Sequence, residues 1–430
     1  MNIKTCSILL LMLTSILLVV NVPLVTAIDN IRIRPDGVVE GTTSIQQDGN
    51  SYTFTGNIVG TIRIEKSGIT IDGNGFTLSG DGTNHGFYLP SANDTIIRNV
   101  RVENCNNGFY LLKTSNNTIT DNIVTNNNVG IYISTSLNTI VTENEVYNNE
   151  VATGGYGINL VSSNGGIVSN NEVYSNYLGI RLLTSQNNIV TGNNVYSNEH
   201  DAIYSRTCTN DVISDNTLSD NGEGGIVLAY SPADYQIINN RILDNGLNGI
   251  QMEYATNITV KENHIENNGK NGIRAFESTD VVISQNNITE NQVDGVYLQA
   301  GSNGNMIFLN NITSNTEYGI NFDTNSEDNM VYYNNFINNG GQAANYPDHP
   351  NIWYSLSPIG GNYWSDYDGQ DNNQDGIGDT PYIIDESNQD NYPLMNKIPE
   401  FPSWMLLPLF LTATIAAIIY RNSLRRKTKN

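Results

Sequence analysis

A two-residue signal recurs along most of this chain at an almost constant spacing. A small residue is followed by an apolar one, and successive copies lie 22 to 24 residues apart except for a single interval of 27. A unit of this size cannot bury its apolar face alone, so a fixed period predicts a solenoid in which stacked units share one core. The small starting residues are Gly86, Gly108, Gly130, Gly157, Gly179, Ala202, Gly225, Gly249, Gly272, Gly295 and Gly319.

Each unit also alternates in the manner of short strands. Gly130 is followed by Ile131-Tyr132-Ile133, then by a second apolar run at Ile140-Val141 and a third at Asn144-Glu145-Val146. Alternation places the first and third residues after the starting residue inside and the second and fourth outside. Three short strands in a unit of 22–24 residues predict an all-β fold, a single-stranded right-handed parallel β-helix.

Asparagines recur at two further positions of the unit. Stacked coils would place each set in a file, where asparagine tolerates left-handed turns and amides about 4.8 Å apart can hydrogen-bond to one another. We expect the first file to consist of Asn122, Asn144, Asn171, Asn193, Asn216, Asn240, Asn263, Asn286, Asn310 and Asn334. We expect the second to consist of Asn126, Asn148, Asn176, Asn198, Asn221, Asn245, Asn267, Asn291, Asn315 and Asn338.

Charge and cysteine content narrow the possible chemistry. The chain has 43 acidic and 20 basic residues and a formal net charge of −23, so we expect no nucleic-acid partner, which would need a basic face. Cys105 and Cys208 lie five repeats apart. At about 4.8 Å per coil this separation is roughly 24 Å, beyond the limit of about 7 Å for a disulfide. We predict two free thiols without a catalytic role.

The two ends of the chain have the composition of targeting segments. Residues 1–27 resemble a signal peptide, cleaved after Val25-Thr26-Ala27 or else retained as an anchor. Residues 399–430 contain an apolar run from Trp404 to Tyr420 and then a basic tail, which predicts a transmembrane helix with a cytoplasmic end. The intervening chain would then be extracellular and membrane-anchored at the cell surface. Five Asn-x-Ser/Thr sequons offer glycosylation sites, at Asn93, Asn116, Asn257, Asn287 and Asn311.

The C-terminal segment also resembles a known sorting signal. The run Pro399-Glu400-Phe401-Pro402 before the apolar stretch is similar to the PEF-type signal of archaeal surface proteins. That resemblance implies a sorting protease-transpeptidase as partner, which would remove the helix and replace the anchor. The expected organisation is therefore a signal peptide (1–27), an N-terminal cap with the first coils (28–85), β-helix repeats (86–339), a C-terminal cap module (340–398) and the sorting segment (399–430).

The cap module contains a candidate calcium loop. Four polar residues fall at relative positions 1, 3, 5 and 9 of an EF-hand-type loop, a glycine occupies position 6, and Ile377 at position 7 could offer its carbonyl. Position 12 is Tyr382 rather than glutamate, so the alternative is a solvated turn. We expect a structural calcium ion. The predicted ligands are Asp371, Asn373, Asp375, Ile377 and Asp379.

The repeats and the cap module together resemble the NosD family. The cap contains Gly361-Asn362-Tyr363-Trp364-Ser365-Asp366-Tyr367, then Asp375-Gly376-Ile377-Gly378-Asp379-Thr380-Pro381-Tyr382 and Asn391-Tyr392-Pro393-Leu394. This resemblance implies a pectin-lyase-like β-helix, found both in proteins that mature the copper site of nitrous oxide reductase and in archaeal surface proteins described as carbohydrate-binding or sugar-hydrolysing. A copper site needs clustered His, Met or Cys. We expect none, because His85, His200, His264 and His349 are dispersed.

Outward positions of the first strand supply most of the candidate site, while Tyr230, Tyr254 and Glu277 fall one place further on, where the strand should be turning. Glu253 and Glu277 lie on adjacent coils and could act as the two carboxylates of a glycoside hydrolase. Arg274 or Arg206 could instead act as the base of a uronate lyase. Tyr88, Tyr110 and Tyr132 form a column that could stack on sugars or on itself. The candidate substrate-binding residues are Tyr204, Tyr230, Gln251, Tyr254, Tyr297 and Asp323.

These observations support several hypotheses about function. The first is a cell-surface protein that binds carbohydrate or cell-envelope polymer along the helix face without catalysis. The second is a polysaccharide hydrolase or lyase that uses the Glu253–Glu277 region. The third is a structural or adhesion protein of the cell surface, and the resemblance adds a fourth, copper-enzyme maturation.

Overall fold

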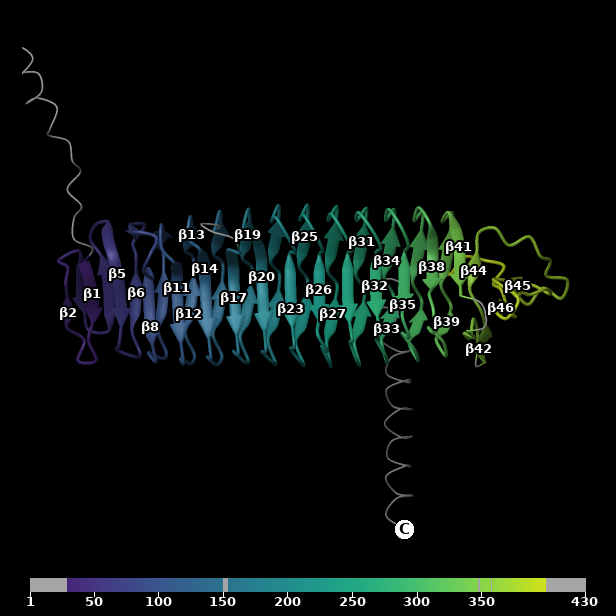
Figure 1. The fold of residues 1–430 in the computed structure, drawn as a ribbon, viewed down its shortest axis with the longest axis horizontal. Helices are drawn as coiled ribbons and strands as arrows, with labels where there is room; N and C mark the ends of the chain where they lie inside the picture. Colours follow the sequence, from purple (N-terminus) through teal and green to yellow (C-terminus); the bar gives the residue numbers. More distant parts are fainter. Residues whose placement is uncertain (1–28, 150–153, 347–348, 357, 400–430) are drawn as a thin grey trace, which may run out of the picture.

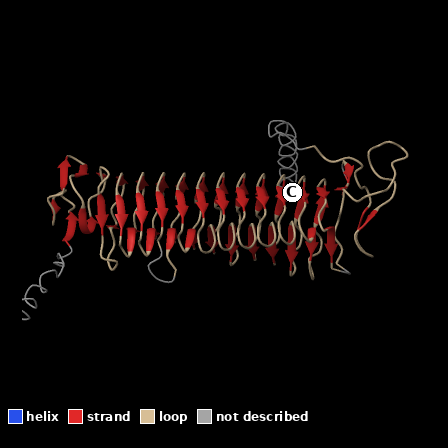
Figure 2. Ribbon diagram, turned by 90° about the horizontal axis from the view of Figure 1, so that it is seen from above, coloured by secondary structure: helices blue, strands red, loops and turns tan. Residues whose placement is uncertain are grey.

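The chain winds about 13 times around a single axis and forms a straight rod of parallel strands (Figures 1 and 2). The computed structural model describes residues 29–149, 154–346, 349–356 and 358–399. The expected signal peptide and the chain after Pro399 lie outside this part, as do the sorting signal and the transmembrane helix assigned to them. Among the described residues, no helix is long and apolar enough to cross a membrane.

Each complete coil contributes one strand to each of three parallel sheets. The first sheet contains β1 (Asp29–Ile33), β5 (Ile58–Ile64), β8 (Phe87–Pro90), β11 (Asn107–Leu112), β14 (Val129–Ser134), β17 (Tyr156–Val161), β20 (Leu178–Leu183), β23 (Ile203–Arg206), β26 (Ile226–Ala229), β29 (Ile250–Glu253), β32 (Ile273–Phe276), β35 (Val296–Gln299), β38 (Tyr318–Phe322) and β41 (Gly341–Asn345).

The second sheet has 14 strands, and the third is joined to the first because β5 pairs with both β7 and β8. The second contains β3 (Ile45–Asp48), β4 (Ser51–Phe54), β6 (Thr70–Asp72), β9 (Ile96–Arg98), β12 (Thr118–Thr120), β15 (Ile140–Thr142), β18 (Ile167–Ser169), β21 (Ile189–Thr191), β24 (Val212–Ser214), β27 (Gln236–Ile238), β30 (Thr259–Lys261), β33 (Val282–Ser284), β36 (Met306–Phe308) and β39 (Met330–Tyr332). The third contains β7 (Thr77–Ser79), β10 (Arg101–Glu103), β13 (Ile123–Thr125), β16 (Glu145–Tyr147), β19 (Glu172–Tyr174), β22 (Asn194–Tyr196), β25 (Thr217–Ser219), β28 (Arg241–Leu243), β31 (His264–Glu266), β34 (Asn287–Thr289), β37 (Asn311–Thr313), β40 (Asn335–Ile337) and β44 (Tyr363–Trp364).

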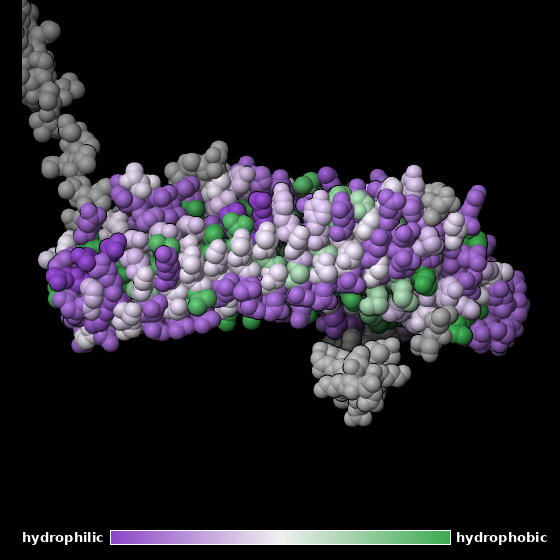
Figure 3. Space-filling view, turned by 60° about the horizontal axis from the view of Figure 1, so that its bottom comes forward, coloured by the Kyte–Doolittle hydropathy of each residue, from purple (hydrophilic) through white to green (hydrophobic). Residues whose placement is uncertain are grey.

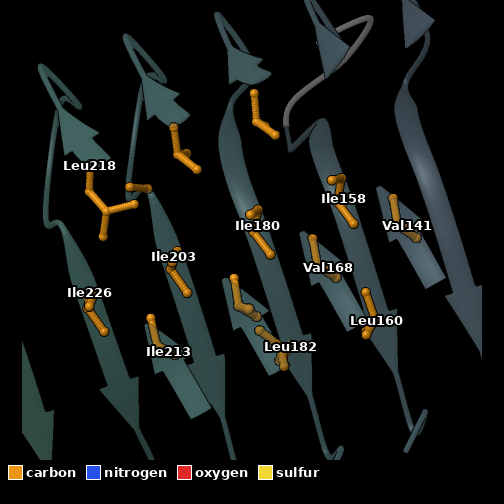
Figure 4. Packing of buried hydrophobic residues seen from close by; sticks show 14 of the residues in the cluster. Val141, Ile158, Leu160, Val168, Ile180, Leu182, Ile203, Ile213, Leu218 and Ile226 are labelled. Carbon is orange, nitrogen blue, oxygen red and sulfur yellow. The ribbon is translucent and has the colours of Figure 1, made fainter. Parts of the chain in front are cut away.

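The core is a set of apolar files that run along the rod axis (Figure 4). In the first sheet Ile158, Ile180, Ile203 and Ile226 follow one another in register, and all four are fully buried. Burying one such side chain contributes roughly 1.5–3 kcal/mol, so stacking of the coils supplies most of the stability of the rod. The predicted inward and outward positions of the first strand are confirmed by this pattern.

Buried asparagines form the first expected file. In its middle, the backbone N–H and Nδ2 of Asn193 both donate to Oδ1 of Asn216, at 2.9 and 3.0 Å. Nδ2 of Asn193 also donates to the Val168 carbonyl at 2.9 Å. The same pattern continues to Asn334 and then to Asn362 in the cap module. Each amide therefore satisfies backbone groups at a turn that would otherwise be buried without partners.

The second expected file is wrong by one residue at four coils. The buried members there are Asn127, Asn149, Asn268 and Asn339. Their predecessors Asn126, Asn148, Asn267 and Asn338 instead adopt left-handed φ angles of 51–54°. Both positions suit asparagine, one for its side-chain amide and the other for its backbone.

Each end of the rod is closed by chain that lies off the stack. At the N-terminus β2 (Val39–Glu40) pairs antiparallel with β1, and β3 pairs antiparallel with β4. At the other end Trp353 and Trp364 cover the last coil, and the Trp364 ring stacks on Phe336 at 4.6 Å. The remaining strands of this cap are β42 (Ser355–Leu356), β43 (Ile359–Gly360), β45 (Tyr382–Ile383) and β46 (Gln389–Asp390).

Candidate functional site

The outward face of the first sheet has one coil with unusually short side chains. At β26 the outward positions hold Val227 and Ala229, and the residue before the starting glycine is Gly224. In each of these three columns the β26 residue has the shortest side chain of all the repeats from Gly86 to Gly319. The neighbouring strands carry Tyr204 and Gln251 in register with Val227.

This difference in length produces a hollow of about 290 Å³, called here the trench. It is bounded by β23 on one side and β29 on the other, two strand spacings or about 10 Å apart. Its lining follows the chain from Glu223 through β26 to Tyr230, and so runs across the axis of the rod rather than along it. The lining residues are Asp201, Tyr204, Glu223, Gly224, Val227, Ala229, Tyr230, Leu247, Gln251 and Glu253.

Four residues predicted from the sequence lie together in the trench. Tyr204 forms part of the β23 wall, and Tyr230 stands exposed at the end of β26. On the β29 wall Gln251 donates a hydrogen bond from Nε2 to Glu253 Oε1 at 2.8 Å. Gln251 Oε1 in turn accepts from Asn248 Nδ2 at 2.7 Å, so the wall is held in a fixed orientation. Arg206 lies with its guanidinium 4.1 Å from the centre of the Tyr230 ring.

Two acidic residues of the trench were missed by sequence reasoning. Asp201 is 7% exposed, and its Oδ1 accepts a hydrogen bond from the Gly224 N–H at 2.8 Å. Burial, and then the charge of Glu223, raises the pKa of Asp201 to about 6. Glu223 itself lies 3.2 Å from His200. Asp201 could have been found in the sequence as an aspartate directly before a small starting residue, a position to which no candidate had been assigned.

The other predicted catalytic residues lie outside the trench. Arg274 donates two hydrogen bonds to Gln299 Oε1, at 3.1 and 2.7 Å, and is 3.7 Å from Glu253. Glu253 is in register with Phe276, so Glu277 lies one position beyond it, exposed and with a left-handed φ of 45°. Glu253 and Glu277 are therefore on adjacent coils but do not share a hollow.

Three further predicted binding residues also lie away from the trench. Tyr254 is exposed at the turn after β29, where its ring meets Phe276 edge-on at 5.5 Å. Tyr297 donates a hydrogen bond from its hydroxyl to Asp323 Oδ2 at 3.0 Å. Burial, and then this bond, raises the pKa of Tyr297 to about 12. Both residues of the Tyr297–Asp323 pair are half-buried, and the two satisfy each other.

The tyrosine column of the early coils is stacked on itself. The ring centres of Tyr88 and Tyr110 are 5.4 Å apart, and those of Tyr110 and Tyr132 are 5.1 Å apart, with nearly parallel planes. The faces of these rings stack on tyrosines of neighbouring coils, which favours a structural role for the column over binding of sugars. Figure 3 shows a rod surface that is mostly hydrophilic, with apolar residues scattered in small groups.

The candidate calcium loop is an exposed turn closed by its own side chains. Asp371 accepts hydrogen bonds from the N–H groups of Gly376 and Asp375, at 2.9 and 3.2 Å. Asp379 Oδ2 accepts from the backbone of Asn372 at 2.8 Å. Nowhere in the described chain do three His, Cys, Asp or Glu side chains form a metal-binding group. A calcium ion would therefore need amide and carbonyl oxygens as well, as EF-hand-type loops provide.

The histidines and cysteines are dispersed over the rod. His85 is bonded to Asn107, His264 to Glu266 and Asn287, and His349 lies 3.5 Å from Glu327. The prediction of two free cysteines is confirmed, because Cys105 and Cys208 are both unpaired and buried. Burial raises the pKa of the Cys105 thiol to about 12, so it is not a reactive thiolate.

Solved structures with a similar architecture include enzymes and an adhesin. A mutant of the periplasmic alginate epimerase AlgG has a TM-score of 0.54 at 13% identity, over 75% of this chain and 82% of that one. The A-module of the Azotobacter vinelandii mannuronan C-5 epimerase AlgE6 gives 0.47 at 15%, over 70% and 87%. The Streptococcus pneumoniae surface adhesin PfbA gives 0.48 at 12%, over 69% and 86%. At such identities the AlgG match establishes a shared fold alone. No curated protein matches the sequence.

Two family models match the chain. One, described as "Right handed beta helix region", matches residues 26–164. The other, described as "Periplasmic copper-binding protein (NosD)", matches residues 142–248 and 225–369, which together span more than half of the chain. The resemblance inferred from the cap motifs is confirmed, and the chain belongs to the NosD family of right-handed parallel β-helix proteins.

Proposed function

We propose that this protein binds a single polysaccharide chain in the trench over β26, outside the cell. The observation that carries the proposal is the set of short side chains at Gly224, Val227 and Ala229, which opens a hollow between two walls of larger residues. The extracellular location rests on the expected signal peptide in residues 1–27.

The chemistry of the trench suits sugar rings. Val227 and Ala229 give an apolar floor, and the ring of Tyr204 offers an aromatic face for stacking, as does the face of Tyr230 that Arg206 does not cover. Gln251 and Glu253 add polar groups in a fixed orientation, which is the usual composition of a specific ligand site. The alginate epimerase that shares this fold acts, by its name, on a polysaccharide, which adds support of a general kind.

The direction of the trench changes the expected mode of binding. Sequence reasoning placed the polymer along the helix face, in contact with many coils. A hollow that follows β26 instead holds the polymer across the rod, in contact with three coils. The remaining coils would then act as a spacer, which combines the binding hypothesis with the structural one.

A variant that fills the trench tests the proposal. Val227→Tyr places in the floor the residue that already occupies the same column at Tyr204, so the coil can accept it. Affinity electrophoresis against a panel of polysaccharides would identify a ligand, and calorimetry would then measure its fragments. We expect V227Y to weaken binding at least tenfold.

A matched control lies in the same column. Asn159→Tyr adds the same ring three coils away, beside Tyr132 and Arg181. Binding should be unchanged in N159Y. Equal affinity of V227Y and the wild type, or equal loss in both variants, would contradict the proposal.

Hydrolysis by Glu253 and Glu277 has weaker support. Glycosidases hold two carboxyl groups about 5 to 9.5 Å apart across one bond of the substrate. Glu253 lines the trench and contacts Gln251 and Arg274, whereas Glu277 is exposed at the following turn. Incubation with the bound polysaccharide should release no new reducing ends. Release that is lost in Glu253→Ala and Glu277→Ala would favour the enzyme instead.

The copper binding in the family description does not fit this chain. Copper sites are built from converging His, Cys or Met ligands. In the described residues the four histidines are dispersed and held by Asn and Glu partners, and both cysteines are buried apart. Of the described methionines, only Met306 and Met330 are in register on neighbouring strands.

We also propose that the loop from Asp371 to Asp379 binds calcium and stiffens the C-terminal cap. Support comes from the spacing of Asp371, Asn373 and Asp375 and from the left-handed φ of 86° at Gly376, which a tight metal loop requires. Calorimetry with Ca²⁺ should show one weak site that is lost in Asp371→Ala. A flat titration of the wild type would contradict this proposal, and D371A binding as tightly as the wild type would move the site elsewhere.

A further inference from the structure

The trench has an unbalanced set of charges. Its lining includes three carboxylates, Asp201, Glu223 and Glu253, and no lysine or arginine, while Arg206 lies at its rim over the Tyr230 ring. Glu253 has Arg274 at 3.7 Å, and Glu223 has His200 at 3.2 Å. Asp201 has no ion pair within 4 Å anywhere in the described chain.

Asp201 is also incompletely hydrogen-bonded. Its Oδ1 accepts from the Gly224 N–H, but in the described part of the chain no group donates to Oδ2. The residue is 7% exposed and lines the trench, so a ligand in the trench has access to this oxygen. A carboxylate that is buried without a counter-charge is unfavourable unless a ligand supplies one.

Other coils show that a carboxylate is not needed for folding at the position directly before the small starting residue. The equivalent residues of two later coils are Asn248 and Asn271, whose side chains are linked by a hydrogen bond of 3.0 Å. Asparagine is therefore accepted at this position. The column contains a second buried aspartate, Asp294, but its oxygens accept from Asn321 Nδ2 and the Tyr318 N–H, both at 3.0 Å.

We propose that the trench selects an amino sugar whose free amine is protonated, and that Asp201 binds this ammonium group through Oδ2. The inference rests on the proposed binding of polysaccharide in the trench and adds the class of sugar. A charge-assisted hydrogen bond from N–H to a carboxylate is about twice as strong as a neutral one.

Two oligosaccharides that share one backbone test this selectivity. The glucosamine tetramer and the N-acetylglucosamine tetramer differ only in the acetyl group that removes the charge. Calorimetry at pH 6.5 in 150 mM NaCl keeps most of Asp201 ionised, because its pKa is about 6, and leaves a substantial share of the amines protonated. The salt screens non-specific attraction to an acidic protein. We expect the wild type to bind the glucosamine tetramer at least tenfold more tightly.

Variants in one column separate the role of Asp201 from general charge. Asp201→Asn keeps the shape and should reduce the preference to within about threefold. Asp294→Asn removes the same charge from an aspartate outside the trench and should leave the preference intact. D294N losing the preference as D201N does would assign it to overall charge and overturn the inference.

The remaining outcomes are also decisive. Equal or tighter binding of the acetylated tetramer, a preference that survives in D201N, or no binding of either tetramer would each overturn the amine selectivity. The proposed function fails separately. If a neutral polysaccharide binds and V227Y abolishes that binding, the trench remains a carbohydrate site and only the inferred amino sugar is wrong.

Discussion

The buried amide of each ladder asparagine joins three successive coils. Asn216 accepts from the N–H and Nδ2 of Asn193 and donates to Asn240 Oδ1 and to the Val190 carbonyl. Removing one such side chain leaves several buried groups without partners. The penalty for an unsatisfied buried group is about 1–3 kcal/mol, which is more than a hydrogen bond contributes when both partners remain.

Asn216→Ala should therefore lower the free energy of unfolding by about 1–3 kcal/mol. The control is Asn194→Ala, which truncates an exposed asparagine of β22 in the same region and should change it by less than about 0.5 kcal/mol. Denaturant titration followed by circular dichroism measures both. Equal effects of the two variants would show that the ladder is not a special source of stability.

Asp211 occupies a buried position at which the preceding coil has Asn188, so a carboxylate replaces an amide there. It is fully buried and accepts from Asn188 and from the Tyr235 hydroxyl, and burial raises its pKa to about 6. Because the unfolded value is near 3.9, the folded state binds the proton more tightly. Its contribution to stability is therefore largest below pH 4 and is lost as the pH rises through 6.

Asp211→Asn should remove this pH dependence. At pH 4 the variant and the wild type should have similar unfolding free energies, whereas at pH 8 the variant should be more stable by about 1–3 kcal/mol. Denaturant midpoints at the two pH values measure the difference. Asp244→Asn, at an exposed aspartate, is the control and should show no such divergence. A D211N variant that is less stable at pH 8 would contradict the assignment.

At the scale of the residue, the asparagine files could be predicted from the sequence. Where two asparagines are adjacent, the sequence did not show which of them points its side chain into the file. At Asn126-Asn127 both neighbours are asparagine, and each position has its own reason to prefer it. The turn geometry decides, with φ of 54° at Asn126 and the side chain of Asn127 inside. Spacing alone cannot distinguish a backbone preference from a side-chain preference.

At the scale of the strand, the small starting residue has a physical cause in the distance between coils. A Cβ atom at Gly249 would lie 2.7 Å from the Gly272 carbonyl oxygen and 2.6 Å from the Ile265 side chain. Nearly the same contacts recur at the equivalent glycines, so close packing of one coil on the next restricts the column to glycine and, at Ala202, alanine. The alternating pattern of the strand has a separate cause, the pleat that points successive side chains to opposite faces, and could be predicted from the sequence.

Gly249→Ala should destabilise the protein by about 1–3 kcal/mol, because the added methyl group overpacks the contact between coils. Gly56→Ala is the matched control, since the only atom near its Cβ would be Ser44 Oγ at 4.0 Å. Thermal unfolding followed by calorimetry distinguishes the two. A G249A variant as stable as G56A would show that the coils can separate to accept the methyl group.

The trench, in contrast, could not be predicted by looking for functional residue types. It arises where the side chains of Val227 and Ala229 are short. The surrounding residues form a site only because these short side chains lie between them. Tyr204, Gln251 and Glu253 were predicted individually as outward residues, and Tyr230 as a residue of the turn that follows the strand. These four residues lie around one hollow only because the outward side chains of β26 are shorter than those of β23 and β29. This can be seen only when the three strands are compared.

At the scale of the whole molecule, the rod separates stability from binding. The core and the ladders are the same in almost every coil, so any single coil can vary on its outer face without loss of the fold. The trench lies at one such varied coil, near the middle of the rod and away from both capped ends. A ligand held across the axis therefore contacts a small part of a long and otherwise repetitive surface.

The most direct test of this account is a crystal structure of the protein with a bound oligosaccharide from the polysaccharide that it retains most strongly. We predict sugar rings over β26, between Tyr204 and Gln251, with the oligosaccharide running along the strand and across the rod. Sugar rings bound along the axis, or over the tyrosine column from Tyr88 to Tyr132, would contradict the account.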